Sequence, residues 1–294
     1  MAKSFIVGAL AFAMFSVPVF PAAIVVSATG PTPASITLAR DQFRLDIGGG
    51  LVAGANGSFG GIRREVNWDG VPDMFSAPNS LPADFFNVNS PRGVIFSTPG
   101  TGFEVSANAG VAPINFGNID PSYAGNFAPF SPQRLFTPIG SNVMDVNFFL
   151  AGTNTPASVN AFGVVFSDVD LANTTSLQFF DSNNLSLGTF FAPNTVGSQT
   201  FSFLGVQFNA GERVARVHIT TGNAPLASGV VDKHGNPIDL VVMDDFLYSE
   251  PIPEPSAFAL CGIGLAARPL SEGAPQKDRA SLIPGRRIGF FGNR

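Results

Sequence analysis

The sequence predicts an all-β protein, an antiparallel two-sheet sandwich of jelly-roll type, and two observations carry that prediction. First, the composition is 30 Phe, 32 Gly and 24 Pro against one Trp, two Tyr and 13% charged residues, which favours short apolar strands separated by turn residues. Second, short apolar runs follow one another through the second half of the chain at close to the spacing of about 8 to 12 residues that is typical of a sandwich. No helical pattern long enough for a crossover lies between these runs, so neither a parallel α/β sheet nor long helices are expected.

The second half of the chain contains the clearest strand predictions. Each apolar run there is bounded by Gly, Pro, Asn or Asp, and the runs near Phe201 and Val214 alternate apolar with polar residues. Such alternation places one face of a strand in a core and the other in water. The expected strands are residues 142–150, 159–169, 176–180, 187–191, 199–208, 214–221 and 240–247.

Two further strand predictions concern the first half. Residues 35–47 contain β-branched residues, and from Phe43 to Ile47 apolar and charged residues alternate, which predicts a half-buried strand. Residues 92–98 and 103–107 flank a short Pro- and Gly-containing stretch, which predicts a hairpin in which these two strands pair.

Residues 1–28 are predicted to be a secretory signal peptide. Val26-Ser27-Ala28 is a small-residue pattern of the kind after which signal peptidase cuts, and Ala23 is a second candidate site. Pro18 and Pro21 interrupt the apolar run before the roughly 20 residues needed to span a bilayer, which favours a cleaved peptide over a membrane anchor. The body that follows, residues 29–250, has no charged or low-complexity linker and is expected to be one sandwich domain.

Charge and cysteine content exclude some classes of protein. Sixteen basic and twenty-one acidic residues give a net charge of −5, and no Lys/Arg stripe runs through the body, so nucleic acid is not an expected partner. Cys261 is the single cysteine and lies beyond the body. A disulfide within the body and a Cys–His catalytic centre are therefore excluded.

Four carboxylates in the second half are candidate metal ligands. Asp168 and Asp170 lie two residues apart at the end of an expected strand, and Asp244 and Asp245 lie in the last expected strand. Carboxylate oxygens suit Ca²⁺, which takes six to eight oxygen ligands, so we hypothesise a calcium site formed from these residues. The alternative is a solvated strand end, since carboxylates mostly stay in water. Paired carboxylates also serve glycoside hydrolysis, but that chemistry needs a defined separation that spacing in sequence does not supply.

A second candidate site is the turn that contains the only Trp. Asn67, Trp68, Asp69 and Asp73 lie close together around Gly70, and oxygen-bearing side chains on such a turn are a hypothetical ligand loop. The alternative is that the acids form local Asx-turns while Trp68 packs in the core. The spacing is not that of an EF-hand.

The segment after the body carries a resemblance to a known family. Ile252-Pro253-Glu254-Pro255-Ser256 precedes the apolar run 257–267 and resembles the PEP-CTERM sorting signal of Gram-negative bacteria that make extracellular polysaccharide. Proteins with that signal carry a signal peptide, and the resemblance implies an exosortase-type processing enzyme as a partner, with Pro253, Glu254 and Pro255 as the sorting motif. Stretches of the body are similar to uncharacterised PEP-CTERM cargo domains: residues 41–49, 64–73, 166–170, 179–181 with 187–188, and 243–246.

The tail departs from that family. The sorting segment, 251–267, contains an apolar run of only eleven residues, 257–267, whereas a membrane-spanning helix needs about 20. Residues 268–294 form a polar, basic tail that is expected to be mostly unstructured, and a frame change in the gene would produce such a tail. We therefore expect poor anchoring, with membrane contact only transiently through the signal segments.

Fold and resemblance together imply a function outside the cytoplasm. We expect a secreted, non-enzymatic matrix protein of the cell exterior or the cell envelope of a Gram-negative bacterium, lectin-like and bound to extracellular polysaccharide. The alternative is a glycoside hydrolase-like enzyme that acts on polysaccharide through paired carboxylates. Catalytic residues are not assigned.

Overall fold

The structure, a computed structural model, describes residues 23–51, 61–232 and 237–254. Most of the predicted signal peptide, Pro255 of the sorting motif, the apolar run after it and the basic tail lie outside the described residues. None of the described helices has the length and apolar character that crossing a membrane requires.

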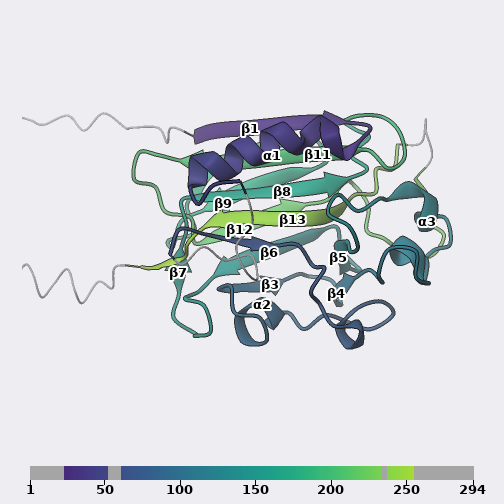
Figure 1. The fold of residues 1–294 in the computed structure, drawn as a ribbon, viewed down its shortest axis with the longest axis horizontal. Helices are drawn as coiled ribbons and strands as arrows, with labels where there is room; N and C mark the ends of the chain where they lie inside the picture. The colour runs from purple at the N-terminus through teal and green to yellow at the C-terminus, as the bar shows by residue number, and fades with distance from the viewer. Residues whose placement is uncertain (1–22, 52–60, 233–236, 255–294) are drawn as a thin grey trace, which may run out of the picture. The chain divides into compact units, whose positions relative to one another are not determined.

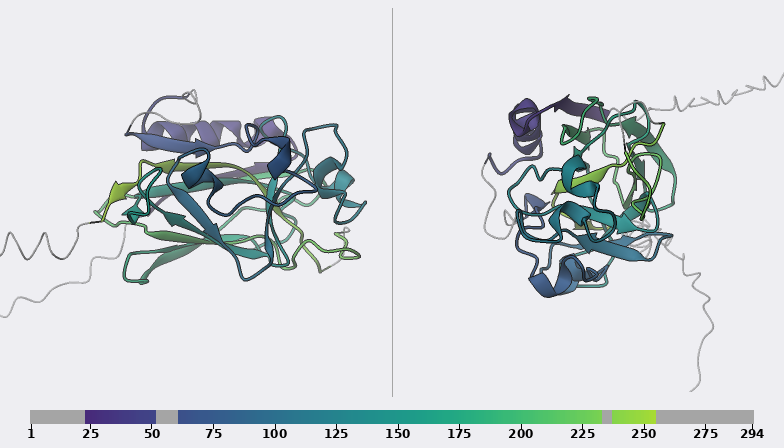
Figure 2. Two further views of the ribbon diagram at one scale, coloured as in Figure 1. Left: turned by 90° about the horizontal axis from the view of Figure 1, so that it is seen from below. Right: turned by 90° about the vertical axis from the view of Figure 1, so that its right-hand side faces the viewer.

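Two antiparallel sheets form the body, which confirms the predicted all-β sandwich (Figures 1 and 2). Within the described residues, sheet A has seven strands and sheet B has five. In spatial order, sheet A contains β1 (Ala23–Gly30), β11 (Phe201–Phe208), β8 (Ala161–Ser167), β13 (Val242–Ser249), β5 (Phe136–Ile139) and β4 (Gly102–Val105), and β2 (Arg63–Val66) also pairs with β13. Sheet B contains β10 (Ser186–Phe191), β9 (Ser176–Phe180), β12 (Arg216–Thr220), β6 (Val143–Phe148) and β3 (Val94–Ser97). All seven strands predicted in the second half are present.

The main core lies between the two sheets. It is made by apolar side chains that alternate inward along the strands, as the period of two requires. Phe162 of sheet A meets Phe148 of sheet B at 6.0 Å between ring centroids, and Phe246 meets Phe96 at 6.2 Å. Edge-on and tilted ring contacts of this kind add to the burial that stabilises the sandwich.

The predicted strand over residues 35–47 is wrong, because this segment is the helix α1 (Pro33–Ile47). Ile36, Phe43 and Ile47 are buried at helical spacing, whereas Leu45 is 50% exposed. Pro33 occupies the start of the helix, where its fixed φ is favourable, and the Thr32 N–H donates to Ser35 Oγ at 3.4 Å. These start signals, and not the local alternation near Phe43, indicate the structure.

Helix α1 covers the outer face of sheet A beside β1 and β11 (Figure 1). The Phe43 ring lies over a pair of glycines, Gly163 and Gly205, that are cross-strand neighbours in β8 and β11. A Cβ at Gly205 would lie 2.6 Å from Phe43 Cδ2. The glycines therefore make room for the ring, and both faces of the sheet centre are buried.

The predicted hairpin of residues 92–98 and 103–107 is also wrong in its pairing. Both segments contain strands, but β3 pairs with β6 in sheet B and β4 pairs with β5 in sheet A. The turn between them passes from one sheet to the other. Strand formation is locally encoded here, whereas the choice of partner depends on contacts distant in sequence.

The remaining described elements are short. They are the helices α2 (Phe85–Val88) and α3 (Tyr123–Asn126), the 3-10 turns η2 (Asp73–Phe75) and η3 (Ile114–Phe116), and the strand pair β7 (Ala157–Ser158) and β14 (Ile252–Pro253). Residue Pro253 of the sorting motif is thus hydrogen-bonded into a two-stranded ladder rather than free of the domain. Glu254 follows it at the end of the described chain.

Candidate functional site

Trp68 is the anchor of the loop after β2. Its ring stacks on Phe136 at 3.9 Å between centroids, and its Nε1–H donates to the Asp244 carbonyl at 2.8 Å. Its φ of 63° lies in the left-handed region, which is unfavourable for a bulky side chain. The expectation that Trp68 packs in the core is therefore confirmed, with only 1% of the residue exposed.

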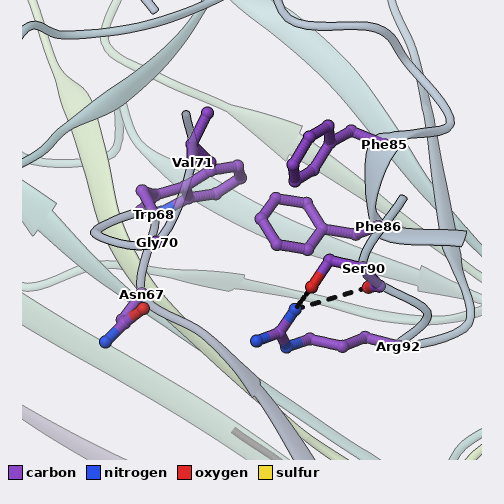
Figure 3. A pocket seen from close by; sticks show the side chains of 8 residues that line it. All are labelled: Asn67, Trp68, Gly70, Val71, Phe85, Phe86, Ser90 and Arg92. Atoms are coloured by element: carbon purple, nitrogen blue, oxygen red, sulfur yellow. Dashed lines mark hydrogen bonds between the residues drawn. The ribbon is translucent and has the colours of Figure 1, made fainter. Parts of the chain in front are cut away.

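A small pocket of about 80 Å³ lies beside Trp68. Asn67 and Gly70 form its rim, Trp68 and α2 supply aromatic walls, and the arginine that precedes β3 supplies a cation (Figure 3). The pocket therefore has room for several waters or a small polar group. The full lining is Asn67, Trp68, Gly70, Val71, Phe85, Phe86, Ser90 and Arg92.

Arg92 is the charged group of this pocket. Only 9% of the residue is exposed, and its guanidinium carbon lies 5.2 Å from the centroid of the Phe86 ring. Nη1 donates to the Ser90 carbonyl at 3.3 Å and to the Ser90 hydroxyl, whereas Nε has no hydrogen-bond partner among the described residues. Burial lowers the pKa of Arg92, because a low-dielectric environment disfavours the charged form.

The predicted ligand loop divides between two places. Asn67 and Trp68 line the pocket, whereas Asp69 and Asp73 face Arg134. The Arg134 N–H donates to Asp69 at 3.2 Å, and the Arg134 guanidinium donates to Asp73 at 2.5 Å. Burial raises the pKa of Asp69 to about 6. These four residues therefore do not converge on one ligand.

Asp168 and Asp170 lie directly after β8 and are both buried. Asp170 accepts the Gly197 N–H at 2.8 Å, and its own N–H donates to Asp239 at 2.9 Å. Oδ1 of Asp168 is buried without a hydrogen-bond partner in the described part of the chain. Burial, and then the nearby charge of Asp170, raise the pKa of Asp168 to about 9. Without a bound cation, its carboxyl group is therefore expected to be protonated at pH 7.

Asp244 and Asp245 occupy a bulge in β13. Met243 pairs with Phe166 of β8 and Phe246 pairs with Val164, so two residues face one on the neighbouring strand. Such a bulge re-aims side chains. Both carboxyl groups are buried, and burial raises both pKa values.

The two bulge carboxylates have different partners. Asp244 accepts the Phe130 N–H at 2.6 Å and the Ser131 hydroxyl at 3.0 Å. Asp245 lies 3.5 Å from Nη1 of Arg40 on α1. Asp244 thus attaches a loop to the sheet and Asp245 attaches helix α1, so the contacts of both acids are those of residues with a structural role.

The two acidic pairs predicted as metal ligands do not meet. The carboxylates whose charge raises the pKa of Asp168 are Asp170, Asp232 and Asp239. Those that raise the pKa of Asp244 are Asp245 and Asp69. Among the residues that the structure describes, no group of three or more His, Cys, Asp or Glu side chains is arranged to hold a metal ion. A single calcium site made from all four predicted residues is therefore not present, and calcium at Asp168 and Asp170 stays a prediction.

Arg92, Phe86 and Asp239 are site residues that sequence reasoning missed. Arg92 was expected only as the first residue of a strand, although it is the sole cation between Arg64 and Arg134. That isolation in the sequence is a usable signal, but only the structure shows that Arg92 has no carboxylate partner in the described part of the chain. Asp239 follows an irregular segment that offers no pattern to place it.

The fold defines this chain as a two-sheet antiparallel β-sandwich with a small cationic pocket at one edge. No family model matches the chain, and no curated protein matches it. A solved structure that is similar in part is the enzymatically active domain of tailspike protein 4 of bacteriophage CBA120, at 12% identity and a TM-score of 0.27. The match covers 57% of this chain and 20% of that one, so the chain spans about a fifth of its length. At that TM-score the similarity identifies neither a fold nor a function.

Proposed function

We propose that this chain is an exported, non-enzymatic protein of the cell exterior that binds extracellular polysaccharide. The observation that carries the proposal is the pocket beside Trp68, with aromatic walls and with an amide, a hydroxyl and a guanidinium as its polar groups. Apolar walls combined with a few placed polar groups are typical of small-molecule binding sites.

The composition of the pocket favours binding over hydrolysis. Glycosidases place two carboxylates on either side of the scissile bond, and none of the described residues that line this pocket carries a carboxylate or an imidazole. The buried acids Asp170, Asp244 and Glu65 are instead hydrogen-bonded to backbone groups or to arginines. The hydrolase alternative would need Asp168 and Asp170 as its pair, and these residues lie outside the pocket lining.

Export is supported by the sequence at both ends. The predicted signal peptide, residues 1–28, extends into β1, and the resemblance to a PEP-CTERM sorting signal begins shortly after β13. A sorting enzyme of the exosortase type would then act near Pro253, where the domain ends in the short ladder of β14 with β7.

Binding and turnover measurements test this proposal. The exported full chain is applied to an array of bacterial polysaccharides, and the bound glycans are then incubated with it and assayed for new reducing ends. We expect retention of at least one polysaccharide and no release of oligosaccharides. Release that Asp168→Asn abolishes would establish the hydrolase alternative, and failure to retain any glycan would contradict the proposal.

A further inference from the structure

Arg92 differs from the other deeply buried arginines of the body. Arg44 and Arg63 contact Glu65 at 2.6 Å and 2.8 Å, and Arg134 contacts Asp73 at 2.5 Å. Arg92 makes no ion pair within the described ranges. A buried charge without a counter-ion is costly, whereas a paired and hydrogen-bonded one is tolerated. An anion bound in the pocket beside Trp68 would therefore compensate the buried positive charge of Arg92.

The remaining groups of the pocket suit the same chemistry. Ser90 holds Nη1 of Arg92 from one side, which orients the guanidinium within the pocket (Figure 3). Asn67 brings an amide to the rim, and an amide N–H₂ is a second hydrogen-bond donor. The donor Nε of Arg92 is left without a partner among the described residues. A planar carboxylate is the anion that matches the forked donors of arginine.

The pocket is large enough to take a carboxylate group. Its volume is about 80 Å³, and its rim at Asn67 and Gly70 is exposed to solvent. In a uronic acid, the carboxylate carbon is C6 and is attached to ring carbon C5, so the carboxylate can enter while the ring stays at the rim beside Asn67 and Gly70. From these observations we infer that the pocket binds the carboxylate of an acidic sugar, with Arg92 as its anchor. That the ligand is a sugar rests on the proposed function, whereas the recognition of a carboxylate rests on Arg92 alone.

Titration calorimetry of the full chain with sodium glucuronate and with its methyl ester tests the inference. The ester keeps the ring and loses the charge. We expect glucuronate to bind at least about tenfold more tightly than the ester, since a hydrogen bond to a charged group contributes about 1.5 to 3 kcal/mol. Equal affinities for the two would overturn the inference.

Two variants assign the binding to the pocket. Arg92→Gln removes the charge, and we expect it to weaken glucuronate binding at least about tenfold. Gly70→Leu leaves Arg92 intact and fills the rim; a Cβ at Gly70 meets nothing within 4 Å, so this variant is expected to fold and to bind neither compound. Arg92→Lys keeps the charge without the fork and is expected to bind with intermediate affinity. Wild-type binding in both Arg92→Gln and Gly70→Leu would contradict the inference.

Two outcomes separate this inference from the proposed function. Retention of neutral polysaccharides alone, with no preference for glucuronate, contradicts the carboxylate site and leaves the polysaccharide-binding function standing. Acetate bound as tightly as glucuronate, with no polysaccharide retained, contradicts the function and leaves the carboxylate site standing.

Discussion

Asp168 has a carboxyl group that the fold removes almost completely from water. The residue is 1% exposed, its φ is 74°, and its Oδ1 has no partner in the described chain. An isolated buried carboxylate would be very costly, and such a group takes up a proton or pairs with a cation. For this single residue, protonation and cation binding lead to different testable predictions.

Protonation makes the stability of the domain depend on pH. The folded pKa of Asp168 is about 9 and the unfolded value is about 3.9, so the folded state holds the proton more tightly. The stabilisation is fully present below pH 4 and is lost as the pH rises toward 9. We expect Asp168→Asn, which stays neutral, to gain stability relative to the wild type across this window, by at most about 1.4 kcal/mol per pH unit.

Urea denaturation in EDTA at pH 5, 7 and 9 measures that difference. Asp46→Asn is a suitable control, because Asp46 is exposed on α1 and accepts a hydrogen bond from Gln42. A wild type and an Asp168→Asn variant whose stabilities stay parallel from pH 5 to 9 would rule out a proton held at Asp168.

The calcium hypothesis predicts a different response. A cation at Asp168 and Asp170 binds the folded state only, so Ca²⁺ raises the free energy of unfolding, by about 2.7 kcal/mol at a hundredfold excess over Kd. Millimolar Ca²⁺ is therefore expected to raise the melting temperature by an amount that grows with concentration. Asp168→Asn removes a ligand and is expected to abolish the rise. A melting curve unchanged by millimolar Ca²⁺ would remove the metal site and leave protonation as the means by which Asp168 loses its charge.

At the scale of the element, Phe43 supplies the aromatic contact of helix α1 with sheet A. Phe43 is fully buried over Gly163 and Gly205. We expect Phe43→Ala to cost about 3 to 5 kcal/mol, as for other buried aromatics. Gly205→Val crowds the same ring and is expected to cost about 1 to 3 kcal/mol.

Denaturation of both single variants and of the double variant measures the coupling. Both changes act on one contact, so the double variant should lose less than the sum of the two. Leu38→Ala is the matched control, since Leu38 lies on the same helix, is 84% exposed and should change stability by less than about 0.5 kcal/mol. Additive losses would show that Phe43 and Gly205 do not act through the same contact.

Strand β1 bears on the site of signal-peptide cleavage. Residues Ala23–Gly30 pair in register with β11, and a cut after Ala28 would remove six of these eight residues. The edge of β11 would then be uncovered, and an open edge strand promotes association. We therefore expect cleavage at Ala23 rather than after Ala28, and N-terminal sequencing of the exported chain decides between them. A mature protein that begins at Thr29 and stays monomeric would contradict this expectation.

At the scale of the whole domain, the two sheets share one core. Trp68, the only tryptophan, is buried in that core and stacks on Phe136. We expect one cooperative unfolding transition, in which Trp68 fluorescence and far-ultraviolet circular dichroism report the same midpoint. Fluorescence that changes at a lower urea concentration than the circular dichroism would show that the sheets separate before they unfold.

The sequence by itself determined the β-rich class and all seven strands of the second half. Their alternation is local, because successive residues of a strand face opposite sides. The polar and acidic residues that make the loop at Trp68 and the two Asp pairs candidate sites could also be identified from the sequence. Alternation near Phe43 misled, because the same five residues also fit about one and a half turns of a helix whose buried face includes Ile36 and Ile47.

Only the tertiary structure decided which groups meet. β3 and β4 lie next to each other in sequence and belong to different sheets, and the acids at Asp168 and Asp244 have separate partners. Arg92 became a candidate because it is buried with no carboxylate partner among the described residues, a property that its local sequence does not predict. The physical reason is that pairing, burial and charge compensation depend on residues far apart in the chain, whereas strand propensity depends on neighbours.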